Sequence, residues 1–280
     1  MLENNSSSGL IQLTDQEFKT LVNFVHSKYG INLIKKRVLI EGRLSQTLHQ
    51  KGFTSFRQYI EFLQADRTGA EMTNFLNKIT TNHSYFAREN EHFDYLANTV
   101  LPYMERTRGN RHDLRIWSAG CSAGQEAYNI AMTIDQYFGP KKFQWDTTIL
   151  ATDISMDVLH RAKAAIYPEN NLTNVPPIWK RKYFKLQPNG EYQVCDKIRK
   201  EVVFKPLNLM EPFYFAKPFD IIFCRNVMIY FDTPTTDRLI EKFYNVTAPG
   251  GYLFIGHSEV VNKELTKYHY VRPAIYQRKE

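Results

Sequence analysis

The chain has 280 residues, of which 43% are hydrophobic and 23% are charged, a balance that is ordinary for a globular protein. This length is enough to bury a sizeable core without staples, which excludes global disorder. No stretch approaches the ~20 apolar residues of a membrane span, so we expect a soluble protein. The net charge is +7 and the sequence pI is about 9.1. A basic balance favours an acidic partner, and it equally fits a positive excess that only aids solubility.

The cysteines and histidines do not form the pattern of a metal site. The three cysteines are widely spaced and include no CxxC pair, so reduced thiols are the simplest interpretation. The eight histidines contain no HxxxH pair, and we predict no metal. Residues 1–9 are polar and lack the apolar region of a signal peptide. We therefore expect a cytoplasmic protein whose residues 1–12 form a disordered tail.

The segment from residue 13 to residue 80 carries a helical pattern. Thr14 and Glu17 form a capping box that opens a helix, and Gly30 is predicted to end it. Three further helices are predicted over residues 35–49, 53–63 and 71–79. Residues 13–80 are therefore predicted to form a small all-α N-terminal domain, followed by a linker and lead-in helix over residues 81–110.

From residue 111 to residue 280 the texture changes, because short apolar runs now alternate with helical patterns. The predicted strands cover residues 114–118, 145–151, 202–204, 219–224 and 252–256. Strands that alternate with helices indicate a mostly parallel sheet covered on both faces. Asn189 and Gly190 supply the positive φ of a tight turn, which predicts an inserted β-hairpin at about residues 183–204.

The strongest local signal is WSAGCSAGQEAY, residues 117–128, which follows a predicted strand and opens a helix. Gly120 and Gly124 permit a tight turn and the close approach of a ligand, at the place where doubly wound sheets bind ligands. The segment is not GxGxxG, which disfavours a dinucleotide, and its spacing excludes a P-loop. A strand–helix turn can be tight without a ligand, so the turn alone leaves both interpretations open.

Polar residues also follow two other predicted strands. Asp153 is suited to accept hydrogen bonds from both hydroxyls of a ribose, or to cap the following helix. Arg225, Asn226 and Tyr230 follow a later buried strand. They are expected either to face the same cleft as Asp153 or to cap the strand end.

Six stretches of the chain resemble the chemotaxis receptor methyltransferases, the CheR family, and they occur in the family's order. They are TTNHSYFARE (residues 80–89), SAGCSAGQEAY (118–128), ATDI (151–154), NL (208–209), FCRNVMIYFD (223–232) and GHSE (256–259). The resemblance spans about residues 13–276, and its CRNVMIYF string is highly specific. It implies a Rossmann-like class I methyltransferase domain with a mixed, mostly parallel seven-stranded sheet and an inserted small β-subdomain, preceded by the all-α domain.

The resemblance also implies an activity and a set of site residues. The activity is transfer of the methyl group of S-adenosylmethionine to glutamate carboxylates of chemotaxis receptors in sensory adaptation, which leaves S-adenosylhomocysteine. Arg88 and Tyr230 match residues near the transferred methyl. The positions that match cofactor-contacting residues are Asn82, Ser84, Arg88, Glu126, Asp153, Asn208, Leu209, Arg225 and Asn226, beside the glycine turn at Gly120. The chain departs from the family pattern at Ser84 (usually Thr), Ala87 (usually aromatic), Gln125 (usually acidic) and Ala127 (usually Pro).

The implied reaction is displacement at the sulfonium methyl by a carboxylate. A free glutamate has a pKa of about 4.3 and is ionised at neutral pH, so no general base is required. This fits a sequence without a convincing His–Asp pair, and catalysis then rests on alignment and the exclusion of water. Our hypothesis is that Arg88 orients the carboxylate and that Tyr230 steers it toward the methyl group.

The family resemblance also implies the partner. Lys35, Lys36, Arg37 and Arg43 cluster on or near one predicted helix, which is expected to dock on acidic methylation helices of receptors; the alternative is a solvated helix face. Because the predicted hairpin loop is short, binding of a receptor C-terminal tail is not expected. Neither is membrane insertion.

Two other functions compete with receptor methylation. A nucleic-acid methyltransferase would fit the basic pI, but the strand end reads Cys-Arg-Asn-Val, where enzymes acting on base nitrogens often carry [DNS]PP[YF]. A regulatory protein of the same family, with bound cofactor and a non-receptor target, is the remaining alternative.

Overall fold

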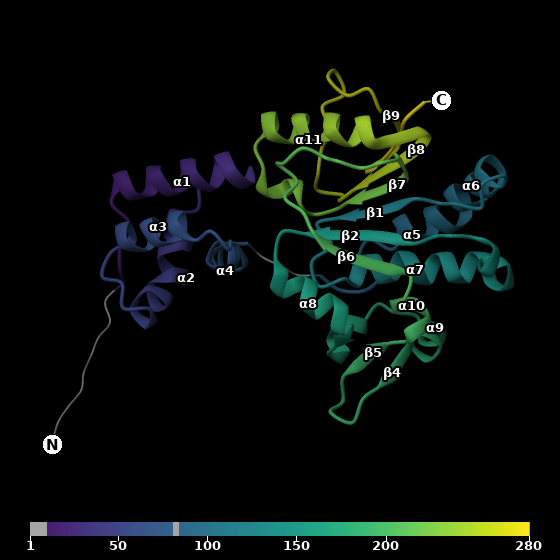
Figure 1. Cartoon of the computed structure of the whole chain (residues 1–280), viewed down its shortest axis with the longest axis horizontal. Coiled ribbons are helices and arrows are strands. Elements are labelled where there is room, and N and C mark those ends of the chain that lie inside the picture. Colours follow the sequence, from purple (N-terminus) through teal and green to yellow (C-terminus); the bar gives the residue numbers. More distant parts are fainter. Residues whose placement is uncertain (1–9, 81–83, 280) are drawn as a thin grey trace. The chain divides into compact units, whose positions relative to one another are not determined.

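The computed structural model describes residues 10–80 and 84–279, which divide into two compact units between residues 82 and 83. The first unit contains four helices, as Figure 1 shows: α1 (Asp15–Tyr29), α2 (Arg37–Gln50), α3 (Phe56–Ala65) and α4 (Ala70–Ile79). Each helix buries apolar side chains such as Leu21, Ile40, Tyr59 and Phe75. The predicted all-α N-terminal fold is confirmed. Residues 1–9 of the predicted tail lie outside the described residues.

The first helix begins and ends where its sequence signals predict. The Thr14 hydroxyl accepts a hydrogen bond from the Glu17 backbone N–H at 3.2 Å, and the Glu17 carboxylate accepts one from the Thr14 N–H at 2.8 Å. Gly30 follows the last turn with φ of 71°, a left-handed conformation that glycine adopts at little cost. The capping box therefore fixes one end of α1 and the glycine fixes the other.

The second unit is built on a mixed seven-stranded sheet, which confirms the predicted fold. The strand order is β6-β2-β1-β7-β8-β10-β9, with the last two pairings antiparallel and the others parallel. The strands are β1 (Ile116–Ala119), β2 (Ile149–Asp153), β6 (Val202–Pro206), β7 (Phe219–Cys224), β8 (Thr247–Ile255), β9 (His269–Arg272) and β10 (Ile275–Gln277).

Helices cover both faces of this sheet, and the sheet separates two clusters of buried side chains. One buried cluster includes side chains of the lead-in helix, α7 (Gln125–Phe138) and α8 (Met156–Ala164). The other is centred on Trp117 and includes α11 (Thr233–Val246) and the segment after β6. Trp117 lies within 5.3 Å, centroid to centroid, of four phenylalanine rings. The remaining short helices are η2 (Gly139–Gln144), η3 (Glu169–Leu172), α9 (Pro177–Tyr183), α10 (Asp196–Arg199) and η4 (Met228–Tyr230).

The lead-in helix is interrupted by one wide turn. It runs through α5 (Glu91–Tyr95), η1 (Leu96–Val100) and α6 (Leu101–Arg108), and η1 is a π-helix. The Leu101 N–H donates to the Leu96 carbonyl, five residues back. Pro102 follows at once and has no N–H to donate, so the wider turn accommodates a residue that would break a regular ladder.

The insertion predicted as a hairpin is a three-stranded sheet. Strands β4 (Phe184–Leu186) and β5 (Tyr192–Val194) pair as predicted around Gly190, whose φ is 83°. A third strand, β3 (Ile166–Tyr167), pairs with the other edge of β5. Strand β6, which falls within the predicted insertion, belongs to the main sheet. Two residues are too short a run for periodicity to reveal, which is why β3 was not predicted.

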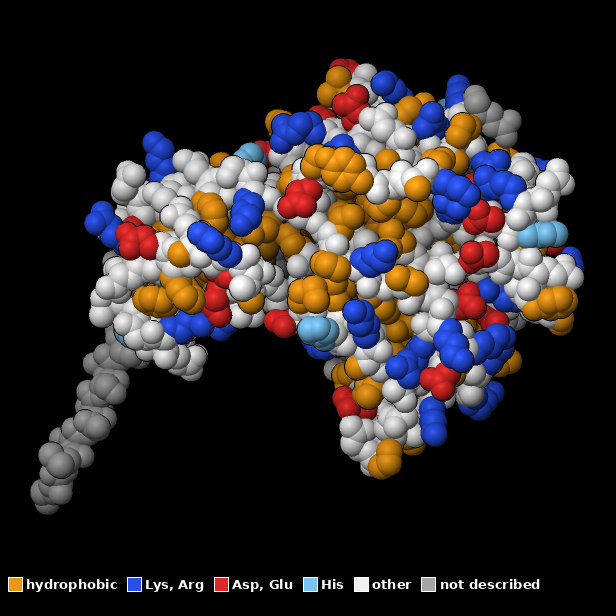
Figure 2. Space-filling view, viewed as in Figure 1, with side chains coloured by type: hydrophobic (Ala, Val, Ile, Leu, Met, Phe, Trp, Pro, Cys, Tyr) orange, Lys and Arg blue, Asp and Glu red, His pale blue; other side chains and the backbone are white. Residues whose placement is uncertain are grey.

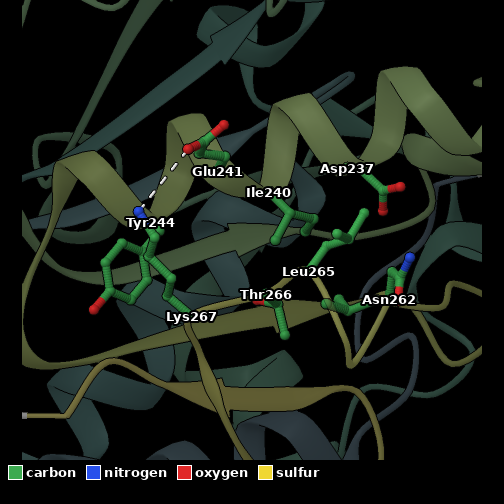
Figure 3. Close-up of a pocket in the computed structure, with 9 residues that line it drawn as sticks. Asp237, Ile240, Glu241, Tyr244, Asn262, Leu265, Thr266 and Lys267 are labelled. Carbon is green, nitrogen blue, oxygen red and sulfur yellow. Dashed lines mark ion pairs between the residues drawn. The ribbon is translucent and has the colours of Figure 1, made fainter.

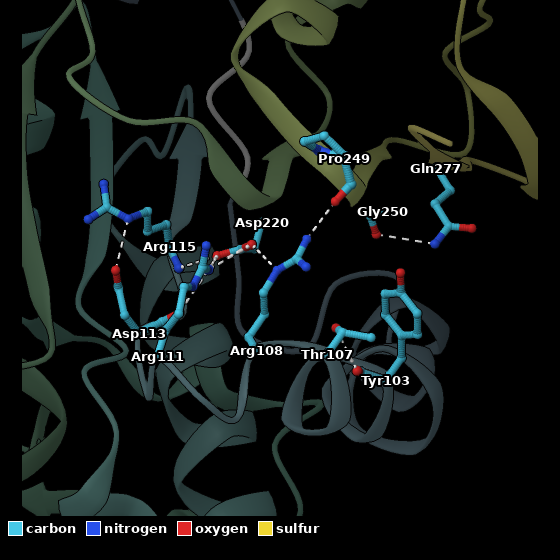
Figure 4. A network of polar contacts seen from close by, with 10 residues as sticks. All are labelled: Tyr103, Thr107, Arg108, Arg111, Asp113, Arg115, Asp220, Pro249, Gly250 and Gln277. Atoms are coloured by element: carbon cyan, nitrogen blue, oxygen red, sulfur yellow. Dashed lines mark hydrogen bonds and ion pairs between the residues drawn. The ribbon is translucent and has the colours of Figure 1, made fainter. Parts of the chain in front are cut away.

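A buried carboxylate fastens the lead-in helix to the amino end of β7 (Figure 4). Asp220 is fully buried and lies 2.8 Å from Arg108 Nε and 3.0 Å from Arg111 Nη2. It also accepts a hydrogen bond from the Arg115 N–H at 3.0 Å. All three cysteines are free thiols. Within the described residues, no helix has both the length and the apolar character to cross a membrane.

Candidate active site

The predicted site residues of the second unit converge at the carboxyl ends of four neighbouring strands. Strand β1 lies between β2 and β7, so the chain leaves the sheet in opposite directions on its two sides. Such a switch point is where doubly wound sheets bind ligands. Gly120 follows β1, Asp153 ends β2, Asn208 follows β6 and Arg225 follows β7. The sheet topology therefore brings together four segments that are far apart in sequence.

The glycine turn after β1 leaves no room for a side chain. Gly120 has φ of 76°, and a Cβ on it would lie 2.4 Å from Val227 Cγ2. Gly124 has φ of 91°, and its Cβ would lie 2.9 Å from the Cβ of Ala162. The backbone N–H of Gly120 also donates to the Thr152 carbonyl at 2.8 Å. Both glycines are thus required by the tight packing of this turn, independently of any ligand.

Asp153 is held so that its carboxylate stays at the strand end. It accepts hydrogen bonds from the backbone N–H of Ser122 at 2.9 Å and of Ser155 at 3.0 Å. The side chain that caps α8 is Ser155, which accepts from the Val158 N–H, so the cap does not require Asp153. Burial raises the pKa of the Asp153 carboxyl, and the backbone donors oppose that rise. Each carboxylate oxygen keeps acceptor capacity for a hydroxyl group.

The start of the segment that follows β6 is held by two hydrogen bonds. The Leu207 N–H donates to the Asp153 carbonyl at 3.0 Å, which places Asn208 and Leu209 next to the end of β2. From α11, Lys242 Nζ donates to the Leu209 carbonyl at 2.5 Å. This segment belongs to no helix or strand, and these contacts hold it at the edge of the sheet.

Arg225 is the centre of a buried ion-pair network. Its side chain is only 2% exposed, and it lies 3.1 Å from a carboxylate oxygen of Glu89 and 3.1 Å from one of Glu126. Its guanidinium also donates to the Arg88 carbonyl. Glu126 accepts a further hydrogen bond from the Ser118 hydroxyl at 2.7 Å. The network therefore links β7, the start of α7 and the segment before α5.

The network sets the charge of the two carboxylates. Burial would raise the pKa of Glu89, but Arg225 and Asn226 outweigh it and hold that pKa below its usual range. The pKa of Glu126 is raised, because burial outweighs Arg225 and Ser118. The buried guanidinium of Arg225 thus allows Glu89 and Glu126 to lie close together in a region of low dielectric constant.

The predicted linker motif is fixed by its own side chains and backbone. Phe86 is fully buried and stacks edge-on against the rings of Tyr167 and Phe184. The Ser84 carbonyl accepts a hydrogen bond from Gln125 Nε2 at 3.3 Å. The predicted cofactor contact Asn82 lies outside the described residues. The linker after it is therefore attached both to α7 and to the small sheet.

Backbone strain is concentrated around this network. Ala87, Glu89, Ser122 and Asn226 all have a positive φ between 49° and 60°, a region that side chains other than glycine rarely adopt. Such strain persists only where the surroundings enforce it, and it is common at functional sites. Arg88 lies between two of these residues and is half-buried, with its guanidinium 5.9 Å from the centroid of the Tyr85 ring.

Tyr230 and a buried glutamate belong to the loop after β7. Tyr230 is half-buried at the end of η4, four residues after Asn226. Glu259 receives four backbone hydrogen bonds, three of them from residues 226–228. Neither Glu259 nor Glu89 is among the predicted site residues. The available signal was that both lie inside strings matching the family.

Glu89, His92 and His257 have ligand-type atoms within 4.8 Å of one another. Two cations oppose metal binding there. Arg225 already pairs with Glu89, and both Arg225 and Arg272 lower the pKa of His92. His92 is 1% exposed, and burial is the main cause that brings its pKa to about 3. We interpret it as a neutral packing residue.

A small cavity of about 30 Å³ lies outside this cleft (Figure 3). It is lined by α11 residues such as Ile240 and Tyr244 and by Leu265 and Lys267 from the loop before β9. Such a volume holds about one water molecule. None of the predicted site residues lines it.

Comparison with known proteins identifies the family. The model of the CheR methyltransferase SAM-binding domain matches residues 82–276, and that of the CheR methyltransferase all-alpha domain matches residues 16–80. The chain is 44% identical to the chemotaxis protein methyltransferase of Borreliella burgdorferi over 96% of both chains. It is 38% identical to a probable chemotaxis protein methyltransferase of Rhizobium etli, over 86% of this chain and 91% of that one. It is 35% identical to the chemotaxis protein methyltransferase of Escherichia coli, over 89% of this chain and 86% of that one.

Two models of one family therefore match nearly all of the chain between residues 16 and 276. The strand-end cleft described above lies within the part that matches the SAM-binding domain. The chain belongs to the CheR methyltransferase family and is an S-adenosylmethionine-dependent methyltransferase.

Proposed function

We propose that this enzyme transfers the methyl group of S-adenosylmethionine to glutamate carboxylates of chemotaxis receptors. The observation that carries the proposal is the agreement between the family and a strand-end cleft that offers carboxylates without a general base. The described part of the cleft contains one nearby buried histidine, His92, and its depressed pKa keeps it neutral. An acceptor that is already ionised at pH 7, as a glutamate is, suits such a site.

The groups at the cleft fit the chemistry of the cofactor. S-adenosylmethionine, when bound, supplies an electrophilic methyl group on a sulfonium, together with ribose hydroxyls and an amino-acid end. The position of the Asp153 carboxylate, held at the end of β2 by two backbone N–H groups, supports a role as the acceptor for these hydroxyls. Arg225 and Glu126 form an ion pair with each other, which occupies much of their capacity for hydrogen bonds. We therefore propose that Arg225 positions the loop and its neighbours, while Asp153, Asn208 and Arg88 supply contacts.

The chain's own residues act on the acceptor carboxylate by orienting it. Arg88 is fixed through its carbonyl by Arg225, and its planar guanidinium suits the recognition of a carboxylate. We propose that Arg88 and Tyr230 align one carboxylate oxygen with the methyl carbon. When bound, the cofactor would supply the methyl carbon for the new C–O bond, and its sulfur would keep the electron pair of the broken C–S bond. No proton moves, so the rate above pH 6 should follow alignment and not ionisation.

Kinetics of two variants test these roles. Tyr230→Phe keeps the ring and should lower kcat by about 10-fold, and Arg88→Ala should raise KM for the receptor and lower kcat by about 100-fold. Methylation is measured at saturating S-adenosylmethionine. Arg106→Ala, on the lead-in helix, is the control and should retain the wild-type rate. If both variants turn over like the wild type, these assignments are wrong.

The start of α2 carries the proposed receptor-docking surface, formed by Ile34, Lys35, Lys36 and Val38. Both lysines are exposed, and the side chains of Ile34 and Val38 are 64% and 81% exposed. An apolar pair flanked by positive charge suits an amphipathic helix with an acidic face. The other two predicted residues have partners within their own unit. Arg37 pairs with Asp15, and Arg43 donates to a backbone carbonyl of α4.

Charge reversal tests the docking surface. The double variant Lys35→Glu, Lys36→Glu should raise KM for the receptor by about 10-fold at low salt, because it turns attraction into repulsion. The affinity for S-adenosylhomocysteine should not change. Lys19→Glu, at an exposed position of α1, is the control. Equal effects of the control and the double variant on KM would contradict the docking surface.

A nucleic-acid partner gains no support from the face of the molecule drawn in Figure 2. On the face drawn in Figure 2, Lys and Arg side chains are interspersed with Asp and Glu and form no continuous basic track. Several lysines of the second unit are paired with acidic residues, as Lys142 is with Glu201 and Lys180 with Glu169. A nucleic-acid partner requires unpaired positive charge along its path. We also propose that the short turn of the small sheet binds no receptor tail, so a receptor without its C-terminal residues should be methylated equally well.

A further inference from the structure

We propose that Glu259 is a positioning residue that holds the backbone of the β7–η4 loop, and thereby the side chains of Arg225 and Asn226 that form part of the wall of the cofactor cleft. The inference rests on the proposed assignment of those two residues to the cofactor cleft. It gives a role to the Gly-His-Ser-Glu string, which the reaction chemistry alone does not use.

The Glu259 carboxylate is saturated by backbone donors. Its Oε1 accepts hydrogen bonds from the N–H groups of Val227 at 2.8 Å and Met228 at 2.7 Å. Its Oε2 accepts from those of Asn226 at 3.0 Å and Gly256 at 2.5 Å. Glu259 is only 8% exposed, so these four bonds replace nearly all of its hydration. A buried carboxylate with four such hydrogen bonds holds the loop firmly, because any movement of the loop would leave the charge without hydrogen-bond donors.

The conformation of the loop explains why three consecutive donors reach one carboxylate. Asn226 has φ of 60° and Val227 lies in the right-handed helical region, with φ of −110° and ψ of −46°. Alternation of left-handed and right-handed residues turns successive N–H groups into a concave anion site. Here the anion belongs to the chain itself. This concave site is therefore filled by Glu259 and holds the loop, and it does not serve as a binding site for an external anion.

The side chains of the same loop point to the other partners of the site. Asn226 Nδ2 donates to Glu89 at 3.2 Å, and Arg225 bridges Glu89 and Glu126. Val227 Cγ2 would lie 2.4 Å from a Cβ at Gly120, so the glycine turn is fitted to the position of this loop. A shift of the loop backbone would therefore disturb two walls of the cleft together.

Gly256 belongs to the same set of hydrogen bonds. A Cβ on it would lie 2.5 Å from Asn226 Nδ2, 3.0 Å from the Asn226 nitrogen and 3.0 Å from Glu259 Oε2. Contacts this short require a neighbour to move. The variant Gly256→Ala therefore displaces the loop while the chain keeps the charge of Glu259, which separates the loss of charge from the displacement of the loop.

The test measures binding of S-adenosylhomocysteine by calorimetry on the full chain. Glu259→Gln keeps the shape, but its amide offers one acceptor oxygen where four donors converge. We expect Glu259→Gln and Gly256→Ala to raise Kd by about 10-fold or more. Glu264→Gln, exposed in the following loop, should leave it unchanged. Asp220→Asn controls for lost stability. Asp220 is buried near the amino end of β7, and the loop held by Glu259 follows the carboxyl end of that strand.

Kinetics distinguish positioning from partial unfolding. A smaller folded fraction lowers kcat and leaves KM for S-adenosylmethionine unchanged, whereas a displaced loop raises that KM. The inference is overturned if the Kd of Glu259→Gln stays within about threefold of that of Asp220→Asn, and a larger ratio supports it. Binding requires no acceptor protein. Failure of glutamate methylation would therefore leave this test intact, and normal methylation with unchanged affinity in both site variants would reject the inference alone.

Discussion

Removal of Arg225 should expose how strongly the ion-pair network stabilises the second unit. In Arg225→Met, two carboxylates whose side chains are only 16% and 14% exposed lose their shared cation. Breaking a buried pair by removing one partner costs about 3–5 kcal/mol, because an uncompensated charge is left behind. With a urea m-value of about 2 kcal/mol/M, the midpoint should fall by about 1.5–2.5 M. Arg225→Lys keeps the charge without the planar fork and should lose about 1–3 kcal/mol.

Tryptophan fluorescence isolates the relevant transition, since Trp117, Trp145 and Trp179 all belong to the second unit. The sign of the pH dependence gives a second check. Without Arg225 the two facing carboxylates should have pKa values above that of the unfolded chain, so protonation favours the folded state. The difference in the free energy of unfolding between the wild type and Arg225→Met should therefore become smaller from pH 7 to pH 5. Arg181→Met, at an exposed position, is the control. A loss under about 1 kcal/mol, or a difference that grows on acidification, would refute the reasoning.

Two further predictions concern buried groups. Burial brings the pKa of His92 to about 3 from 6.5, so the unfolded chain alone takes up this proton between those values, and stability falls as pH drops. The wild type should lose about 2 kcal/mol from this group between pH 7 and pH 5 in urea titrations, and His92→Gln should remove that slope; an unchanged slope would contradict a neutral, buried His92. Gly120→Ala combines a positive φ with a Cβ 2.4 Å from Val227, and it should cost about 2–5 kcal/mol and weaken S-adenosylhomocysteine binding. Gly190→Ala, with φ of 83° and open space around its Cβ, is the matched control and should cost only about 1–2 kcal/mol; equal losses would contradict the crowding at Gly120.

Local signals predicted the elements of this chain well because each depends on nearby residues. The capping box of Thr14 and Glu17 and the terminal Gly30 set α1 without help from the rest of the fold. Strand β7 was predicted with its observed bounds, since its six consecutive buried residues are all apolar except Asp220. By contrast, β3 has two residues, and its pairing with β5 depends on the surrounding insertion.

The site was harder to predict because its contacts cross long distances in sequence. The order of the strands brings Gly120, Asp153 and Arg225 to one edge, and that convergence followed from the strand pattern. The pairing of Arg225 with Glu89 could not be predicted from the strand pattern, since Glu89 lies 136 residues away on a strained turn. Similarly, nothing local distinguishes Glu259, whose role depends on three N–H groups more than 30 residues earlier.

The most direct measurement is transfer of a tritiated methyl group from S-adenosylmethionine to membranes that contain chemotaxis receptors. Glutamate methyl esters are hydrolysed by base, so the label on the receptor band should be released as methanol at high pH. We predict base-labile counts that disappear when the receptor's methylation glutamates are replaced by alanine. Binding of the cofactor with no counts on the receptor, or with counts that resist base, would contradict glutamate esterification and favour a regulatory member of the family.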